Sequence, residues 1–244
     1  MNFLPGQGFW LHAQFDIFAW LAAAATLAFV GRRFGFGLPV SPPQRFAYYA
    51  ALFFGAALGA YGFGTLNLWL LGVHEAARSI EGALAGGIIA IEAFKRANGL
   101  TERTGARLAA PFAIGVVIGR VGCFLAGLDD FTYGVPTGLP WGHDFGDGIP
   151  RHPVQLYESL SMLAFLAAYF LALRRNLAFV ARNGFYLAVG FYGLQRFVWE
   201  FFKPYAPLLG PFTLFHLLSA ALVAYAIFMI LTDKEAEFVQ PRPA

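Results

Sequence analysis

The chain has few charged residues and a single cysteine. Only 13% of its 244 residues are Asp, Glu, Lys or Arg, while 58% are hydrophobic. Ordinary soluble domains carry about 25% charged residues, so this composition excludes a water-soluble globule. The one cysteine, Cys123, excludes an internal disulfide, and its position in an apolar run predicts a packed thiol. No Lys or Arg precedes the first apolar run near Phe15, so we expect that run to remain as a spanning helix rather than to act as a cleaved signal.

Apolar runs of membrane-spanning length occur seven times. They cover residues 15–30, 47–71, 76–94, 108–126, 154–173, 184–202 and 211–231. Most of them reach the roughly 17–25 residues that a helix needs to cross the hydrocarbon core. The sequence therefore predicts an all-α integral membrane protein with seven transmembrane helices, forming a single polytopic domain over residues 1–244.

The basic residues alternate from one side of these runs to the other. Only Arg151 and Lys203 lie in the loops on one side. The other side carries twelve, namely Arg32, Arg33, Arg45, Lys95, Arg96, Arg103, Arg107, Arg174, Arg175, Arg182, Lys234 and Arg242. Because basic loops stay in the cytoplasm, we expect the N-terminus outside, the C-terminus cytoplasmic and the loop of residues 128–153 facing outward.

Two arginines lie inside predicted spans. An arginine near the centre of a spanning helix costs roughly 2.5–3.5 kcal/mol on insertion scales, so it is kept where it faces a polar cavity and pairs with an anion. Arg196 has Glu200 four residues later, which allows an internal ion pair. Arg120 has no acidic residue three or four positions away, so its counter-charge must come from another helix or from a ligand. Our hypothesis is that it binds a phosphate rather than an internal carboxylate. A phospholipid headgroup is the expected anion.

Charged residues also open the third predicted span. Glu75, Arg78 and Glu81 are spaced three apart and can share one helical face, either as interfacial charges or, for Glu81, facing the bundle interior. Glu81 precedes one of three glycine pairs whose spacing lets membrane helices approach closely. These pairs are Gly55–Gly59, Gly82–Gly86 and Gly115–Gly119.

The outer loop is rich in glycine, proline and ionisable residues, and we expect it to be irregular and to carry part of the site. Its ionisable residues are Asp129, Asp130, His143, Asp144, Asp147, Arg151 and His152. No recognised metal-ligand spacing occurs among them, so we expect no metal. Gln155, Tyr157 and Glu158 follow at the start of the next span, where Tyr157 is either an interfacial aromatic residue or part of the site.

Three runs, GRVGCF at 119–124, RHPVQLYES at 151–159 and RFVWEFF at 196–202, together resemble the prolipoprotein diacylglyceryl transferase family. The resemblance implies a seven-span enzyme of the bacterial inner membrane that uses phosphatidylglycerol and needs no cofactor. Such enzymes move the diacylglyceryl group onto the thiol of a lipobox cysteine and release glycerol phosphate. The implied partners are the lipid donor, a prolipoprotein or other periplasmic acceptor and the membrane, with no nucleic acid.

Carried over by position, Arg120 matches the arginine of the family's signature motif, Arg196 an arginine near the headgroup, and Tyr157 the family's tyrosine. Some positions depart from the family. Glu81 stands where the family has histidine, and Cys123, Ala126 and Leu128 stand where it has two asparagines and a glutamate. The phosphate-holding half is therefore retained, while the polar groups near the acceptor are changed.

These considerations define two sets of site residues. The expected catalytic residues are Arg120, Arg196, Glu81, Glu200 and His152, and the last three compete for the role of base, with Glu81 favoured. The expected substrate-binding residues are Arg78, Arg151, Gln155, Tyr157, Glu158, Asp129 and Asp130. Three functions remain open: the prolipoprotein transferase, a related transferase that gives the same group to a glycan or small alcohol, and a non-enzymatic lipid-binding or transport protein.

Overall fold

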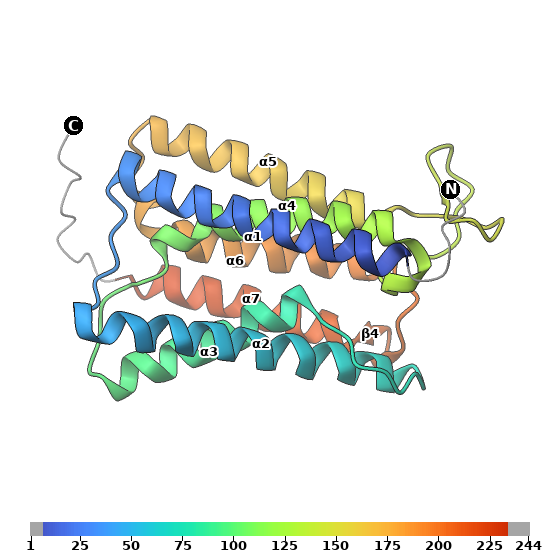
Figure 1. The fold of residues 1–244 in the computed structure, drawn as a ribbon, viewed down its shortest axis with the longest axis horizontal. Helices are drawn as coiled ribbons and strands as arrows, with labels where there is room; N and C mark the ends of the chain where they lie inside the picture. The colour runs from blue at the N-terminus through green and yellow to red at the C-terminus, as the bar shows by residue number, and fades with distance from the viewer. Residues whose placement is uncertain (1–6, 234–244) are drawn as a thin grey trace. The chain divides into compact units, whose positions relative to one another are not determined.

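Long helices make up most of the fold. In the computed structural model, which describes residues 7–233, they are α1 (Gln7–Phe34), α2 (Arg45–Leu70), α3 (Ile80–Ala97), α4 (Ala109–Ala126), α5 (Val154–Arg174), α6 (Ala178–Glu200) and α7 (Leu214–Leu231) (Figure 1). Each lies on one predicted span, so the number and order of helices expected from the sequence are confirmed for the described residues. Helices α1, α2, α4, α5 and α7 are long and apolar enough to cross a membrane. The protein is a mostly helical membrane protein.

Short elements connect these helices. Three of them are single-turn 3-10 helices, η1 (Pro42–Gln44), η2 (Ala106–Leu108) and η3 (Gly127–Asp130). The others are two antiparallel strand pairs, β1 (His143–Asp144) with β2 (Pro150–Arg151) and β3 (Pro207–Leu209) with β4 (Phe212–Thr213). The outer loop was expected to be irregular, and the pairing of β1 with β2 corrects this in part.

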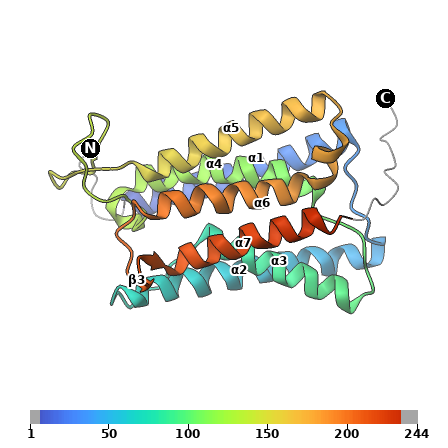
Figure 2. The ribbon, with the colours of Figure 1, turned by 180° about the vertical axis from the view of Figure 1, so that it is seen from behind.

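The chain forms two compact units. Unit 1 comprises Met1–Phe36, Gly105–Pro204 and Val223–Ala244, and unit 2 comprises Gly37–Thr104 and Tyr205–Leu222. Within unit 1, α4 contacts α1, α5 and α6. Figures 1 and 2 show α1 on one side of α4 and α6 on the other. Half of the most apolar stretch of α4 is buried, against 11% for α1, so α4 is the central helix of this unit.

Unit 2 is built on close packing between α2 and α3. A Cβ atom added at Gly59 would lie 2.1 Å from the carbonyl oxygen of Gly82, and one at Gly55 would lie 2.7 Å from that of Gly86. Only glycine allows this approach, which confirms the two predicted packing pairs. The third pair is wrong at Gly115, because a Cβ atom there would meet nothing within 4 Å.

The third helix begins later than the sequence suggested. Ser79 is its N-cap, with extended backbone (φ −130°, ψ 125°) and a side-chain oxygen that accepts a hydrogen bond from the Gly82 amide at 3.1 Å. Glu75 and Arg78 therefore precede the helix, and the expectation that they share a helical face with Glu81 is wrong. The charge spacing implied a helix that includes Glu75 and Arg78, but the helix begins only after the Ser79 cap.

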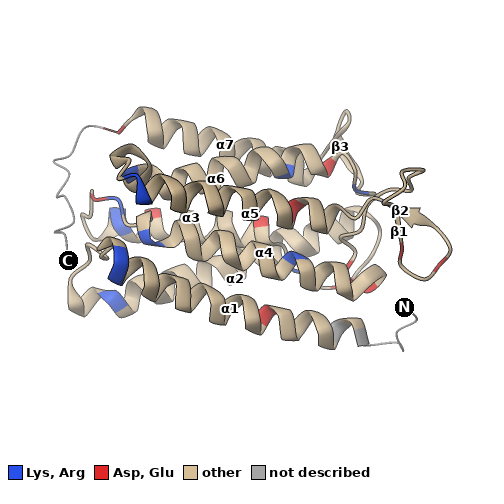
Figure 3. Cartoon of the chain, turned by 90° about the horizontal axis from the view of Figure 1, so that it is seen from above, with Lys and Arg blue, Asp and Glu red and all other residues tan. Residues whose placement is uncertain are grey.

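Basic residues lie together at one end of unit 1. Arg32 and Arg33 lie in the last turn of α1, and Arg174 is the last residue of α5. The 3-10 helix η2, which carries Arg107, contacts both α1 and α6. Figure 3 shows the Lys and Arg of α1 and α5 at the end of this unit away from β1 and β2. Two residues of the predicted basic set, Lys234 and Arg242, lie outside the described residues.

The glycine contact between α2 and α3 predicts a position-specific effect on stability. Gly59→Ala forces a methyl group against the Gly82 carbonyl and should destabilise the protein by roughly 1–3 kcal/mol. Gly62→Ala is the matched control on the same helix, because a Cβ atom there meets nothing within 4 Å. Unfolding in detergent micelles measures both changes. Equal stability of the two variants would contradict the close packing.

Candidate functional site

The most concentrated set of charges lies in unit 1 around Glu158. This residue is in the second turn of α5 and has no solvent exposure. Its carboxylate lies 2.6 Å from Nε of Arg120 in α4 and 2.7 Å from Nζ of Lys203, which follows α6. The Nη1 atom of Arg196 lies 3.4 Å from Glu158 and 2.6 Å from Glu200, one helical turn along α6. We call these five residues the charge cluster.

The charge cluster holds three cations and two carboxylates, so it carries one surplus positive charge. At most 5% of any of the five residues is exposed. Burial, together with the nearby Arg196 guanidinium, lowers the pKa of Lys203 to about 8. Removing charges from water costs several kcal/mol per ion, and a buried ion pair often gains little net stability. The arrangement therefore favours binding of an anion over a purely structural role.

The ion pairs correct one expectation and confirm another. Arg120 was expected to bind a ligand phosphate rather than an internal carboxylate. Its partner is Glu158 of α5, so the exclusion of an internal carboxylate is wrong, while phosphate binding stays a prediction. The sequence could not show this pairing, because the two residues belong to different helices. The predicted pair between Arg196 and Glu200 is confirmed at the expected spacing of four residues.

Several buried polar groups beside the charge cluster have no hydrogen-bond partner among residues 7–233. They are both polar atoms of the Gln155 side chain, both of Gln195 and the indole nitrogen of Trp199. Gln155 lies one turn before Glu158, and the other two flank Arg196 and Glu200 in α6. Buried polar groups are nearly always satisfied, so these atoms indicate that a polar ligand or water completes the site.

The outer loop reaches this region through aromatic residues. The indole nitrogen of Trp141 donates a hydrogen bond to the Tyr157 hydroxyl at 2.9 Å, and Nδ1 of His152 lies 3.4 Å from the same oxygen. The Tyr157 ring lies 5.1 Å from that of Trp199 between centroids. Three predicted site residues, His152, Gln155 and Tyr157, thus lie where the outer loop joins α5.

Arg151 is engaged within the loop itself. Its guanidinium contacts both carboxylate oxygens of Asp147 at 2.7 Å and lies over the Tyr133 ring. This hydrogen-bonded pairing holds the pKa of Asp147 below its usual range. In the antiparallel pair of β1 and β2, Arg151 lies opposite His143. Its side chain and its backbone therefore both stabilise the loop conformation.

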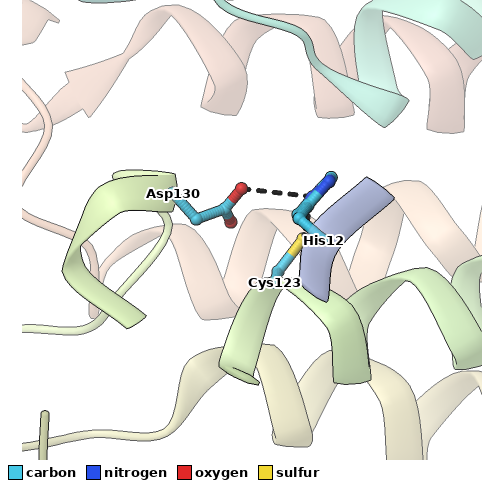
Figure 4. Close-up of side chains that lie close together, drawn as sticks. All are labelled: His12, Cys123 and Asp130. Carbon is cyan, nitrogen blue, oxygen red and sulfur yellow. Dashed lines mark hydrogen bonds and ion pairs between the residues drawn. The ribbon is translucent and has the colours of Figure 1, made fainter. Parts of the chain in front are cut away.

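A second group of reactive side chains lies where α1 meets the end of α4. The Nε2 atom of His12 is 3.2 Å from Oδ1 of Asp130 and 3.4 Å from Sγ of Cys123. Figure 4 shows these three side chains close together. The Nδ1 atom of His12 is 3.2 Å from Oδ2 of Asp16. We call His12, Cys123 and Asp130 the thiol cluster. The neighbouring Asp129, also predicted as a site residue, is exposed.

Glycine brings the two helices together at the thiol cluster. A Cβ atom at Gly122 would lie 2.5 Å from that of Phe15, and one at Gly8 would lie 2.7 Å from the Ala126 carbonyl oxygen. After α4 the chain turns sharply at Gly127, whose φ of +71° is open to glycine, and this turn returns Asp130 towards α1.

Sequence reasoning missed His12, Asp16 and Lys203 as site residues. His12 and Asp16 are four residues apart at the start of the first span, and Lys203 follows Glu200 by three. Each spacing places the two residues on the same side of a helix, so both could have been recognised in the sequence. Cys123 was expected to be a packed thiol, and it is buried.

Two predicted residues belong to unit 2. Glu81 is 1% exposed and accepts a hydrogen bond from the Ser219 hydroxyl at 2.7 Å. Arg78 is exposed in the segment before α3. His216, considered as a core histidine, accepts a hydrogen bond from the Thr213 amide at 3.1 Å.

The helices and the buried charge cluster define a helical membrane protein whose interior carries a surplus positive charge. The family model for prolipoprotein diacylglyceryl transferase matches residues 9–232, and the chain belongs to this family.

Curated relatives carry the name phosphatidylglycerol–prolipoprotein diacylglyceryl transferase. The protein from Geobacter sulfurreducens is 38% identical over 62% of this chain and 60% of the relative. The proteins from Zymomonas mobilis and Nitrobacter winogradskyi are each 31% identical, over 79% and 80% of this chain and 67% and 61% of the relatives. The matched part of the chain spans about half to two thirds of the length of relatives such as these. No solved structure matches it.

The role of Glu158 predicts a large stability effect. Glu158→Gln leaves three buried cations facing one carboxylate and should cost about 3–5 kcal/mol of unfolding free energy. Asp147→Asn removes an exposed ion pair in the same unit and should change stability little. Denaturant unfolding in detergent compares the two. A Glu158→Gln protein as stable as the Asp147→Asn protein would show that the charge cluster is not held by Glu158.

Proposed function

We propose that the protein transfers the diacylglyceryl group of phosphatidylglycerol to the lipobox cysteine thiol of prolipoproteins. The observation that carries this proposal is the surplus positive charge of the buried charge cluster. A phosphodiester carries one negative charge, which would balance that surplus. The names of the relatives agree with this substrate pair.

In this reaction the acceptor sulfur attacks the glyceryl carbon that carries the phosphate. A C–S bond forms, the C–O bond breaks, and its electron pair leaves with the glycerol phosphate. Arg120, Arg196 and Lys203 are the groups that would stabilise the departing phosphate, since cations fixed in a dry site need no reorganisation as charge develops. The unpartnered amides of Gln155 and Gln195 would bind the rest of the headgroup.

Three residues are candidates for the base that deprotonates the acceptor thiol: Glu81, Glu200 and His152. Glu200 is already paired with Arg196 at 2.6 Å, which stabilises its charge and weakens it as a proton acceptor. His152 is held against the Tyr157 hydroxyl. We keep Glu81 as first choice, because it occupies the position of the family's histidine.

We also propose that all seven helices of the single polytopic domain span the bacterial inner membrane. The N-terminus would lie outside, the C-terminus in the cytoplasm, and the loop of residues 128–153 outside, carrying part of the site. The support is the asymmetry of basic residues in the sequence and their gathering at one end of unit 1.

Direct transfer tests the function. Purified protein is supplied with phosphatidylglycerol labelled in its acyl chains and with a lipobox peptide, and a peptide with serine in place of the cysteine is the matched control. Label should appear on the cysteine peptide alone, with an equal amount of glycerol phosphate. Absence of label from both peptides would contradict the proposal, and label on a glycan or small alcohol of a membrane extract would favour the alternative acceptor.

The pKa of Lys203 predicts a pH dependence. Below about pH 8 the ammonium group is charged and attracts the phosphate, and above it that charge is lost. The value of kcat/KM for phosphatidylglycerol should therefore fall as pH rises through about 8. Lys203→Arg should move this fall to higher pH, while Lys203→Met should lower the rate on the order of 10²–10³-fold and remove the fall. Lys95→Met, in unit 2, should keep the wild-type profile. An unchanged profile in Lys203→Arg would rule out this role.

The proposed orientation predicts which loops are reached from outside. A membrane-impermeant thiol reagent should label a cysteine placed at Gly138 in intact cells and should spare one placed at Asn98. The native Cys123 is buried and serves as the unlabelled background. The reverse labelling pattern would overturn the orientation.

A further inference from the structure

The thiol cluster brings three metal-ligand atoms together that the phosphate-binding account does not use. Nε2 of His12, Sγ of Cys123 and a carboxylate oxygen of Asp130 all lie within 4.8 Å of one another (Figure 4). They come from α1, from α4 and from the turn that follows α4. A histidine, a thiolate and a carboxylate are the three side-chain types that bind Zn²⁺ in proteins.

The spacing of these atoms fits a tetrahedral zinc ion. Zinc bonds of about 2.0–2.1 Å to nitrogen, 2.0–2.2 Å to oxygen and 2.3 Å to sulfur set tetrahedral edges of about 3.4 Å for N–O and about 3.6 Å for N–S. The structure has 3.2 Å between His12 and Asp130 and 3.4 Å between His12 and Cys123. These two edges would need shifts of a few tenths of an ångström to accommodate the ion, and all three ligand atoms lie within 4.8 Å of one another.

The surrounding groups orient these ligands as metal sites require. Asp16 lies 3.2 Å from the other ring nitrogen of His12, Nδ1, while Nε2 faces Asp130 and Cys123. The Thr132 hydroxyl donates a hydrogen bond to Oδ2 of Asp130, while Oδ1 faces His12. A carboxylate behind a ligating histidine and a hydrogen bond to a ligating carboxylate are recurrent features of zinc sites. The net charge also balances, because Zn²⁺ with one thiolate and one carboxylate is neutral.

We propose that His12, Cys123 and Asp130 bind a zinc ion whose fourth position binds the acceptor thiol. This replaces the expectation, drawn from the loop residues alone, that the protein holds no metal, and its acceptor half rests on the proposed function. Zinc sites with three protein ligands keep an open position for substrate, and a thiol bound there is deprotonated.

Arg120 links this zinc site to the donor site. Its Nη1 atom lies 4.0 Å from Sγ of Cys123, and its Nε atom lies 2.6 Å from Glu158 in the charge cluster. An acceptor sulfur on the metal would thus lie beside the guanidinium proposed to hold the phosphate. With zinc bound, the metal rather than the proposed base would deprotonate the acceptor: the thiol proton would pass to solvent on binding, the sulfur would form the C–S bond with the glyceryl carbon, and the C–O electron pair would leave with glycerol phosphate.

The same residues admit a different reading, in which Cys123 is itself the nucleophile, with His12 as base and Asp16 behind it. Attack of its sulfur on the glyceryl carbon would give a thioether on the enzyme. A thioether does not pass its alkyl group to a second thiol under these conditions, so this step would end in an inactivated protein. Label from the lipid on Cys123 after turnover would therefore overturn the zinc proposal.

Metal binding is tested first, without lipid. The full-length protein in detergent is equilibrated with Zn²⁺ or with Co²⁺, desalted and analysed for metal. Wild type should hold about one ion per chain, and its Co²⁺ form should show a sulfur-to-cobalt charge-transfer band. His74→Ala, which changes a histidine of unit 2, should match wild type. Cys123→Asn, which places the family's residue there, and His12→Gln should lose the ion. Wild-type protein that binds no more metal than these variants would overturn the proposal.

Asp16→Asn gives a finer test of the ligand arrangement. It keeps all three ligands and should weaken zinc binding by about 10–100-fold, because the histidine loses its orienting carboxylate. Unchanged affinity would contradict the assignment of Asp16 behind His12.

The acceptor role is tested next on the Co²⁺ form. Adding the lipobox cysteine peptide should strengthen the charge-transfer band, and the serine peptide should leave it unchanged. An identical spectrum with both peptides would overturn the acceptor role. No phosphatidylglycerol is present, so this result is independent of transfer, and a failed transfer assay with a responding spectrum would count against the proposed donor reaction alone. In the transfer assay, chelation should lower the rate on the order of tenfold or more, and Zn²⁺ should restore it.

Discussion

The carboxylate of Glu158 is the contact on which the interior of unit 1 depends. It neutralises part of the charge of Arg120, Arg196 and Lys203, which come from two helices and from the turn that follows α6. Without it, three cations would face a single carboxylate in a place where water cannot reach them. A buried network of this kind contributes little net stability while its disruption is costly. The proposed binding of an anion to the remaining positive charge gives such a network a function in an apolar protein.

Glycine sets the second constraint. Gly122 and Gly8 let α1 approach α4 closely enough for His12 to reach Cys123, and Gly127 turns the chain so that Asp130 joins them. Arg120 stands one turn before Cys123 on α4, so one helix carries both the arginine proposed to bind phosphate and the thiol. The proposed donor and acceptor sites therefore share neighbouring turns of α4.

The sequence predicts what depends on local spacing. Apolar run length identified each described helix, and a separation of four residues identified the pair Arg196–Glu200. It could not assign Glu158 to Arg120 or His12 to Cys123, because contacts between helices depend on their rotation and offset, which no local pattern records. The predicted start of α3 was too early for a different reason. The charged residues before Ser79 have helical spacing, but the helix begins only after Ser79, which is its N-cap. The outer loop contains two short strands that were not predicted, because His143 and Arg151 pair across a glycine-rich turn.

The charge cluster is the proposed binding site of the donor phosphate. An experimental structure of the protein in a bilayer disc containing phosphatidylglycerol tests this most directly. The account predicts headgroup phosphate oxygens within about 3 Å of a nitrogen of Arg120, Arg196 or Lys203. A bound headgroup elsewhere, with the ion pairs of Glu158 and Glu200 unchanged and no phosphate beside them, would contradict it.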